Sequence, residues 1–434
     1  MQSPECWRLI SHGRVVRDLS AQVDEKAIRI MKQDTGGSSL PLADIRVLEL
    51  GQLIAGPYCG QVLADFGADV LKIEPPGKGD AMRQWGASDE AGKPIWWNQI
   101  ARNKQSMTLD LRQADGQDVL RQLVADADVL IENFRPGTME KWGLGYEELS
   151  AINPRLIMVR VTGFGQNGPY SQRAGYASVC EAMGGLRYVS GYPDRPPVRV
   201  GISLGDTLAG VHAALGALVA IHQRERSGRG QVVDSTIYES VFGMMESIIP
   251  DYVLGGKVRE RSGSILPGIA PSNAYPAKGG RDVIIGANQD SVFTRLCEVM
   301  GRSDLSLDER FSSHRARGAN QTELDELIGE WSAGFDAEEL VHLLSKAGVP
   351  CGLVYSAPEM LADPHFQARE SIVQIADAQG RQIPMQNVFP RLSQTPGKVR
   401  HVGPELGAHT DETLSQRLGF PEDRIQNLRE RGII

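Results

Sequence analysis

Short runs of β-branched and aliphatic residues alternate with helical stretches along the first half of the chain. The runs are almost continuously apolar, which is typical of strands that are covered on both faces of a sheet. Strands that alternate with helices predict parallel βαβ units and therefore a doubly wound, Rossmann-like sheet. The predicted strands are residues 45–50, 68–74, 129–133 and 156–162, with predicted helices that include 58–66 and 116–127.

A second, smaller α/β unit is predicted in the second half of the chain. Residues 255–280 are rich in Gly, Ser and Pro, which is typical of a boundary or a functional loop. Before this boundary, an apolar stretch at residues 208–221 is too short for the roughly 20 residues that a bilayer requires, so it predicts a buried helix. The elements predicted after the boundary are strands at 282–287 and 351–355 and helices near 289–300, 321–333 and 337–347.

Charge and cysteine content narrow the function classes. The 434 residues include 46 Lys and Arg against 54 Asp and Glu, and this net charge of -8 has the wrong sign for a nucleic-acid-binding protein. The 5 cysteines form no CxxC pair, so neither a disulfide framework nor a cysteine-rich zinc site is predicted. No secretory signal is recognised at the N-terminus. We expect a cytoplasmic globular protein with no nucleic-acid or membrane partner.

The common catalytic and phosphate-binding motifs are missing from the sequence. It contains no HExxH or Walker sequence, and no GxGxxG between the first strand and the first helix. Instead, residues 51–57 (GQLIAGP) break the chain at the carboxyl end of the first strand. Ligands bind at this end of the strands in open α/β sheets, so the break is a candidate binding loop.

Several segments are similar to one known family. They are residues 42–76, ARNKQSMTLDL (101–111), IENFRPGTMEKWGLGYEEL (131–149), NPRLIMVRVTGFGQNGPY (153–170), GYASVCEAMGGL (175–186), GISLGDTLAG (201–210), SGRGQVVDSTIYE (227–239), GVPCGLVYSAPEMLADPHF (348–366) and GAHTDETL (407–414). Together they resemble the class III coenzyme A transferases, the family of formyl-CoA transferase and of the carnitine and bile-acid CoA transferases. The resemblance extends from about Pro41 to the C-terminus.

This resemblance implies an enzyme that moves CoA from an acyl-CoA to a free carboxylic acid, without a metal or a redox cofactor. It also implies an interlocked homodimer in which each chain forms a ring threaded by the other. The expected domains are an N-terminal extension (1–41), a large Rossmann-like CoA-binding domain (42–225 and 366–434), a linker (226–255), a small domain (256–350) and a second linker (351–365).

The mechanism implied by the resemblance needs one side-chain carboxylate that attacks the thioester and then carries CoA itself. The family pattern has an aspartate directly after Gly-Tyr, but this chain has Ala177 there. Glu181 lies four residues further on, and residues at i and i+4 share one face of a helix. We therefore predict Glu181 as the nucleophile. The alternative is that Glu181 is a solvated helix residue in a non-catalytic acyl-CoA-binding protein, and Asp206 is interpreted as a helix cap.

Further site residues follow from the resemblance. Gly163 and Gly165, or the loop at 262–272, are candidates for stabilising the oxyanion. Arg173 and Arg199 are candidates for binding a second carboxylate, which favours succinyl-CoA and a dicarboxylic acceptor. The remaining residues of the substrate site are Tyr176 and Ala177, and the predicted CoA-binding residues are Gln52, Leu53, Ile54, Ala55, Lys72, Arg102, Asn103, Lys104, Asn133, Phe134, Arg135, Lys141 and Phe164.

A 2-methylacyl-CoA racemase of the same fold is the other enzyme class to consider. That reaction needs a His and Asp pair that exchanges protons on either side of the carbon next to the thioester. The chain has no histidine between His12 and His212, and the expected aspartate is replaced by Ala177. The sequence therefore favours CoA transfer over racemisation.

Overall fold

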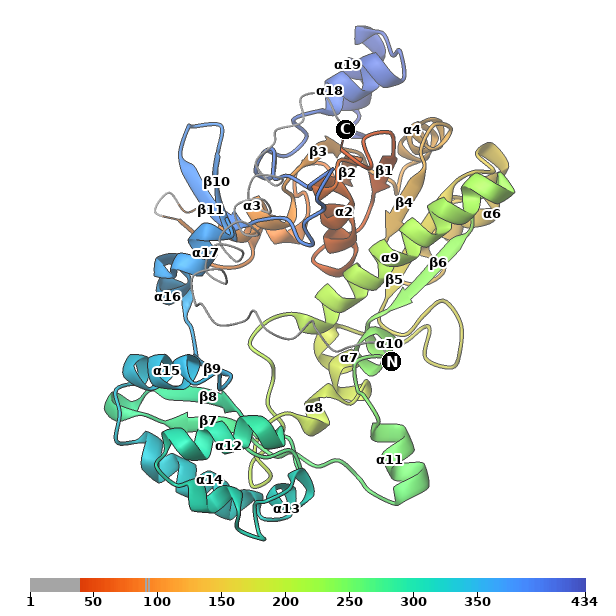
Figure 1. Ribbon diagram of the computed structural model, residues 1–434. Helices are drawn as coiled ribbons and strands as arrows, with labels where there is room; N and C mark the ends of the chain where they lie inside the picture. Colours follow the sequence, from red (N-terminus) through yellow and green to blue (C-terminus); the bar gives the residue numbers. More distant parts are fainter. Residues whose placement is uncertain (1–39, 90–91, 93) are drawn as a thin grey trace, which may run out of the picture.

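A parallel sheet with six strands forms the large lobe of the protein (Figure 1). The structure is a computed structural model that describes residues 40–89, 92 and 94–434, so the predicted extension lies outside the described residues except for its last two positions. The strands are β1 (Arg46–Glu49), β2 (Asp69–Glu74), β3 (Lys104–Thr108), β4 (Val129–Glu132), β5 (Ile157–Thr162) and β6 (Val232–Thr236). Their order, β3-β2-β1-β4-β5-β6, confirms the Rossmann-like prediction.

The order of the strands reverses between β1 and β4, which pair side by side although β2 and β3 follow β1 in the chain. In sheets of this kind a crevice opens beyond the carboxyl ends of the two strands at the reversal. The loops that leave β1 at Leu50 and β4 at Asn133 therefore frame the expected ligand site. The edge strand β3 was not predicted, because its sequence KQSMT lacks the apolar run that marks the other strands.

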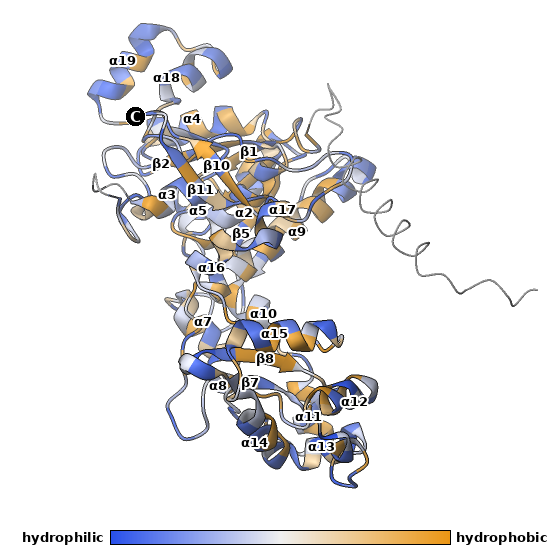
Figure 2. Ribbon diagram, turned by 60° about the vertical axis from the view of Figure 1, so that its left-hand side comes forward, coloured by the Kyte–Doolittle hydropathy of each residue, from blue (hydrophilic) through white to orange (hydrophobic). Residues whose placement is uncertain are grey.

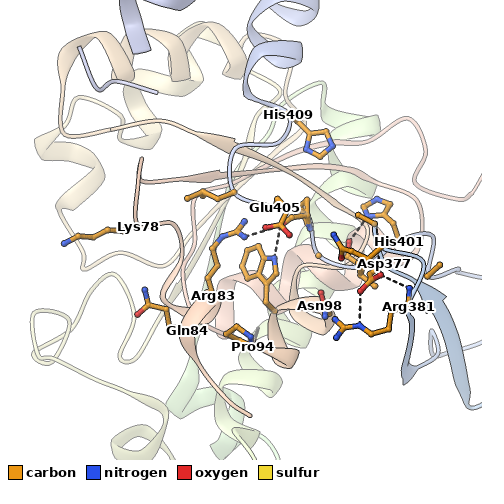
Figure 3. A pocket seen from close by; sticks show the side chains of 18 of the residues that line it. Lys78, Arg83, Gln84, Pro94, Asn98, Asp377, Arg381, His401, Glu405 and His409 are labelled. Carbon is orange, nitrogen blue, oxygen red and sulfur yellow. Dashed lines mark hydrogen bonds and ion pairs between the residues drawn. The ribbon is translucent and has the colours of Figure 1, made fainter. Parts of the chain in front are cut away.

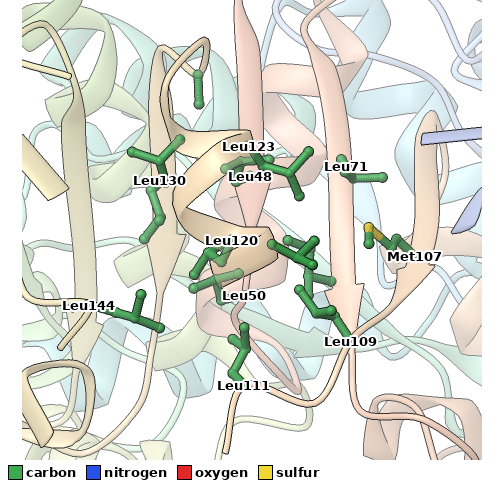
Figure 4. Close-up of a cluster of buried hydrophobic side chains, with 14 of the residues drawn as sticks. Leu48, Leu50, Leu71, Met107, Leu109, Leu111, Leu120, Leu123, Leu130 and Leu144 are labelled. Carbon is green, nitrogen blue, oxygen red and sulfur yellow. The ribbon is translucent and has the colours of Figure 1, made fainter. Parts of the chain in front are cut away.

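Helices cover both faces of the sheet. On one face, α4 (Ala114–Val124), α6 (Tyr146–Ile152) and α19 (Glu422–Glu430) enclose a leucine-rich core in which Leu48, Leu71 and Leu120 are buried (Figure 4). On the other face, α2 (Ala55–Asp65) and α9 (Leu204–Ser227) cover a second core that contains Val47, Val129 and Val159. Successive side chains of a strand point to opposite faces, so Val47 and Leu48 supply one residue to each core.

The small lobe is a three-stranded antiparallel sheet packed against helices (Figures 1 and 2). Its strands are β7 (Ser272–Pro276), β8 (Asp282–Gly286) and β9 (Cys351–Leu353), and its helices are α12 (Asp290–Val299), α13 (His314–Ala319), α14 (Gln321–Ser332) and α15 (Ala337–Lys346), with the 3-10 turns η2 (Lys278–Gly280) and η3 (Ser303–Ser306). Phe293, Leu324 and Leu340 lie at the centre of its core.

Two of the predicted domain boundaries differ from the structure. Residues 226–255 are not a simple linker, because they contain β6 of the large sheet, α10 (Ile237–Phe242) and α11 (Ile248–Gly255). The small lobe extends beyond residue 350, because β9 pairs with β8. The strand predicted at 351–355 is present as β9, so only its assignment to a linker is wrong.

The C-terminal part of the chain returns to the large lobe (Figure 1). It contains α16 (Ala357–Ala362), α17 (Pro364–Ala368), a hairpin of β10 (Ile372–Ala376) and β11 (Gln382–Gln386), α18 (Thr410–Glu412) and the π-helical turn η4 (Thr413–Arg417). The segment before α18 lies against the free edge of β3. There the His409 N–H donates to the Ser106 carbonyl (2.9 Å), and the Thr108 N–H donates to the Thr410 hydroxyl (3.0 Å). This segment covers the edge of the sheet.

The apolar helix α9 is only half buried, which corrects the prediction of a fully buried helix. Ala209, Ala213 and Ala217 pack into the core. On the opposite face Leu215 and Val219 are 55% and 59% exposed. Within the described part of the chain, α9 is the one helix whose length and composition would allow it to cross a membrane. Its alanine face packs on the sheet, so the exposed face is the feature that requires an explanation.

Candidate active site

A cavity of about 320 Å³ lies in the crevice between β1 and β4. Its walls come from the loops after β1, β4 and β5 and from the segment before α7 (Ala177–Met183). Separate stretches of the chain therefore meet here as the sequence predicts. The predicted site residues that line the cavity are Gln52, Leu53, Asn133, Phe134, Arg135, Gly163, Phe164, Arg173 and Tyr176.

Exposed cations and an aromatic pair lie on and just after the segment 133–136, which lines the cavity. Arg135 and Lys141 are exposed, as residues that bind a phosphorylated ligand must be. Phe134 packs edge-on against Trp142, with a distance of 5.3 Å between the ring centroids. Lys141 belongs to the short helix α5 (Thr138–Lys141), which directly follows the lining segment 133–136. A charged, partly aromatic rim of this kind suits the nucleotide end of coenzyme A.

Three of the predicted CoA-binding cations are buried and already paired. Lys72 and Lys104 are 1% and 0% exposed, and both ammonium groups bind the buried Glu49 carboxylate, at 3.0 and 2.7 Å. Arg102 binds the Asp65 carboxylate at 2.6 Å. Buried charges need such partners because they have lost their hydration. The direct phosphate contacts predicted for these residues are therefore not available in the structure.

Three other predicted CoA-binding residues have structural roles. The Asn103 amide donates to the Asp65 carboxylate (2.8 Å) and to the Lys398 carbonyl (2.9 Å), which ties the sheet to the C-terminal segment. Ile54 and Ala55 are each 5% exposed and lie in the core at the start of α2. Asn103 therefore stabilises the contact with the C-terminal segment, while Ile54 and Ala55 directly follow the loop residues that line the cavity.

Glu181 is buried in α7, with 1% of its surface exposed, and both of its carboxylate oxygens are engaged. Oε1 accepts a hydrogen bond from the Gly205 N–H (3.1 Å), and Oε2 accepts one from Arg187 (3.2 Å). The side chain thus reaches the first turn of α9. The alternative of a solvated helix residue is wrong, and a free, attacking carboxylate is not what these contacts describe.

The Asp206 carboxylate lies close to the Glu181 carboxylate but lacks the hydrogen bonds that hold Glu181. Helix α9 begins at Leu204 after its N-cap residue Ser203, so Asp206 is inside the first turn and the predicted capping role is wrong. No hydrogen bond or ion pair joins its carboxylate to any other residue that the structure describes. Burial, together with the Glu181 charge and against the opposing Arg199 charge, raises the pKa of Asp206 to about 6. Sequence reasoning did not single out this residue as a candidate nucleophile.

The two predicted oxyanion glycines differ in their surroundings. The Gly165 N–H donates to the Thr162 hydroxyl (2.9 Å), so it is already engaged and does not suit an oxyanion. Gly163 lines the cavity. A side chain at Gly163 would meet the Cys180 sulfur at 3.1 Å and the Gly175 backbone at 3.2 Å. Gly163 therefore stays a candidate, and glycine there permits close packing against α7.

The two arginines predicted to bind a second carboxylate are both exposed. Arg173 lines the cavity and lies over the Tyr170 ring, 4.2 Å from its centroid. Arg199 contacts the hydroxyl of the N-cap residue Ser203 at 3.4 Å and lies close enough to Asp206 to lower its pKa. Neither guanidinium forms an ion pair with a carboxylate in the described ranges, so both are available to an acidic ligand.

Known proteins are similar to this chain over most of its length. The profile of CoA-transferase family III matches residues 42–410. The chain belongs to CoA-transferase family III. A succinyl-CoA–D-citramalate CoA-transferase of Chloroflexus aurantiacus is 56% identical over 394 residues, which cover 91% of this chain and 98% of the relative. The beta subunit of a succinyl-CoA–L-malate CoA-transferase of the same organism is 41% identical, over 92% of this chain and 99% of the relative.

A solved structure agrees with these relatives. A CaiB/BaiF family protein from Brucella suis is 36% identical and superimposes with a TM-score of 0.78, covering 87% of this chain and 100% of the solved one. The protein is therefore an enzyme, a family III CoA-transferase that uses acyl-CoA as a substrate. This outcome confirms the resemblance and favours transfer over the racemase and non-catalytic alternatives.

The CoA-transferase also has a larger cavity, of about 710 Å³, beside β3 (Figure 3). It is lined by α3 (Ile95–Ile100), by the turn of the β10–β11 hairpin and by the segment that covers β3. Two of its cations are paired, Arg83 with Glu74 (2.7 Å) and Arg381 with Asp377 (3.1 Å). None of the predicted site residues lines it. We place the active site in the smaller cavity.

Proposed function

We propose that the enzyme moves CoA from succinyl-CoA to a small dicarboxylic acid that carries a hydroxyl group. Both Chloroflexus relatives are named for succinyl-CoA as donor and for a hydroxy dicarboxylic acid as acceptor. The 56% identity to the D-citramalate enzyme carries this proposal. It is supported by Arg173 and Arg199, whose unpaired guanidinium groups suit the free carboxylate that donor and acceptor both carry.

Asp206 is the attacking carboxylate in this proposal. It has no protein partner to hold it back, whereas both oxygens of Glu181 are engaged. The raised pKa of Asp206 indicates a more basic carboxylate than an ordinary aspartate. Glu181 remains the second candidate, because it was predicted from the sequence and lies beside Asp206. The two are separated by the variants described in the Discussion.

The exchange then proceeds through two kinds of covalent intermediate, an acyl anhydride and an enzyme thioester. The Asp206 carboxylate attacks the succinyl thioester carbon, which forms a mixed anhydride and releases CoA as a thiolate. The thiolate attacks the Asp206 acyl carbon, which forms an enzyme thioester and releases succinate. The acceptor carboxylate attacks this thioester, and the thiolate released again attacks the acceptor acyl carbon. The new acyl-CoA leaves, and the Asp206 carboxylate is restored without use of water.

The acceptor range tests the proposed substrate class. We expect succinyl-CoA with D-citramalate or L-malate to give the corresponding acyl-CoA and free succinate. Monocarboxylic acids of similar size should be poorer acceptors by about 10²-fold in kcat/KM, because they leave the arginines unpaired. Chromatography of the CoA products after incubation with each donor and acid measures this. Equal use of mono- and dicarboxylic acids would contradict the substrate class.

Arg199 gives a second test of the same class. We expect Arg199→Gln to raise the KM for both succinyl-CoA and the acceptor about tenfold, because a charge-assisted hydrogen bond contributes roughly 1.5–3 kcal/mol. The affinity for free CoA, which lacks the acyl carboxylate, should stay unchanged in calorimetry. The matched control is Arg195→Gln, an exposed arginine of the same loop that should have no effect. A change in CoA affinity alone would place Arg199 at the nucleotide instead.

We also propose that the enzyme is an interlocked homodimer. Apolar side chains on three helices are left exposed by the residues that the structure describes. They include Val211, Leu215, Leu218 and Val219 of α9, Val179 and Met183 of α7, and Ile249, Tyr252, Val253 and Leu254 of α11. Monomeric proteins rarely leave so large an apolar surface uncovered. The path of the chain, which leaves the large lobe after α10 and returns through α16, supports a ring (Figure 1).

A further inference from the structure

The loop between β1 and α2 contains a leucine in a backbone conformation that leucine avoids. Leu53 has a φ of 64° and belongs to the wall of the 320 Å³ cavity. In this left-handed region the Cβ atom crowds the following carbonyl, so residues other than glycine need support from their surroundings. A leucine held there indicates that the surrounding side chains impose the turn.

Two side chains hold the turn from different strands. Asn133, which follows β4, accepts from the Gln52 N–H (2.8 Å) and donates to the Gln52 carbonyl (2.7 Å). Asp80, which lies beyond β2, accepts from the Leu53 N–H (3.0 Å). Three hydrogen bonds therefore fix two consecutive residues of the loop. The Asn133 contacts differ from the predicted role of this residue as a direct CoA ligand.

Asp80 is itself held by buried charge. It is 1% exposed, and its second oxygen pairs with the Lys72 ammonium at 2.8 Å. Lys72 also donates to the Gly51 carbonyl at 2.7 Å, one residue before the strained turn. Lys104 donates to the Pro57 carbonyl at 2.7 Å, in the first turn of α2. The lysines of the buried ion pairs thus bind the backbone of the loop and of the helix that follows it.

We infer that Asp80 is a positioning residue that keeps Leu53 in its left-handed turn and so shapes the wall that receives coenzyme A. Asn133 holds Gln52, the residue before Leu53, in the same way. The inference rests on the proposed function only in taking this cavity as the CoA site. Asp80 itself is buried and does not line the cavity, so it acts through the loop.

The test compares glycine and alanine at position 53 in a protein that lacks the hydrogen bond between Asp80 and the Leu53 N–H. Asp80→Ala removes both the acceptor of the Leu53 N–H and the charge that pairs with Lys72, and we expect it to weaken the binding of free CoA about tenfold in calorimetry. Adding Leu53→Gly should restore most of the affinity, because glycine adopts a positive φ without strain. Adding Leu53→Ala, which also removes the side chain but keeps the strain, should restore nothing.

Equal affinities of the glycine and alanine double variants would overturn the inference, and so would an unchanged affinity in Asp80→Ala. If Asp80→Ala does not fold, Asn133→Ala leaves the Lys72 pair intact and carries the same comparison at position 53. Free CoA is the ligand throughout, so a wrong assignment of the acceptor acid or of Asp206 would leave these affinities as they are. Failure of the proposed function is therefore seen separately, in the product analysis.

Discussion

Asp206→Asn should reduce the transferase activity at least about 10³-fold, because the amide cannot form the enzyme thioester. Wild-type enzyme incubated with succinyl-CoA alone should carry CoA on the peptide that contains Asp206, and the variant should carry none. Mass spectrometry of the digested protein measures the adduct, and steady-state kinetics measure the rate. Substantial activity in the variant would exclude Asp206 as the nucleophile.

Glu181→Gln is the matched comparison, since it removes the neighbouring carboxylate while keeping its size and its ability to accept from the Gly205 N–H. We expect the adduct to form on the same peptide, with kcat reduced about tenfold because the first turn of α9 is less firmly held. An adduct that disappears in this variant, and that is found on the α7 peptide of the wild type, would instead establish Glu181 as the nucleophile.

The pKa of Asp206 adds a pH dependence with a definite sign. Its pKa rises to about 6 from an ordinary value of 3.8, so the folded protein disfavours the charged form. This cost is absent below about pH 4 and complete above about pH 6. Asp206→Asn should therefore stabilise the protein by about 3 kcal/mol at pH 7 and not at pH 4. Wild-type activity should fall below pH 6, because the protonated acid cannot attack.

Charging the exposed face of α9 should separate the subunits. We expect the double variant Leu215→Arg and Val219→Arg to change the sedimentation of the protein from dimer to monomer and to abolish transfer, because two buried charges without partners would cost several kcal/mol. Analytical ultracentrifugation and activity assays on the same sample measure both effects. A fully active dimer would show that this face is not the interface.

Leu307→Arg provides the control for that experiment. Leu307 is 82% exposed on the small lobe and lies outside the apolar surface of α7, α9 and α11, so its replacement should leave the dimer intact.

Subunit exchange tests whether the two chains are interlocked. Threaded rings cannot separate without unfolding, so tagged and untagged dimers should not exchange subunits until denaturant is added. Rapid exchange in buffer would support a simple, unthreaded dimer.

The sequence predicts what depends on local pattern and misses what depends on contacts across the fold. Strands β1, β2, β4 and β5 were predicted because each is an apolar run, whereas β3 was hidden by its polar residues. Lys72 and Lys104 were interpreted as phosphate ligands because their partner Glu49 lies far away in sequence. A lysine inside an otherwise apolar strand was the available signal for an internal ion pair.

The assignment of the carboxylates shows the same limit. The spacing between Ala177 and Glu181 is visible in the sequence, and it made Glu181 the natural choice. The contact of Glu181 with Gly205 brings together residues 24 positions apart and cannot be derived from periodicity. Asp206 was assigned to the helix cap because aspartate is common there. Only the position of the helix start, at Leu204, leaves its carboxylate without a structural role.

The segment that covers β3 has a consequence for the nascent chain. Thr108 and its partner Thr410 are 302 residues apart, so ribosomes need about 15–60 s to make the cover after the strand, at about 5–20 residues per second. During this interval a strand edge with unpaired N–H and C=O groups is open to other chains. Synthesis of the enzyme therefore includes a period of exposure to aggregation, in which chaperones that shield extended segments can act.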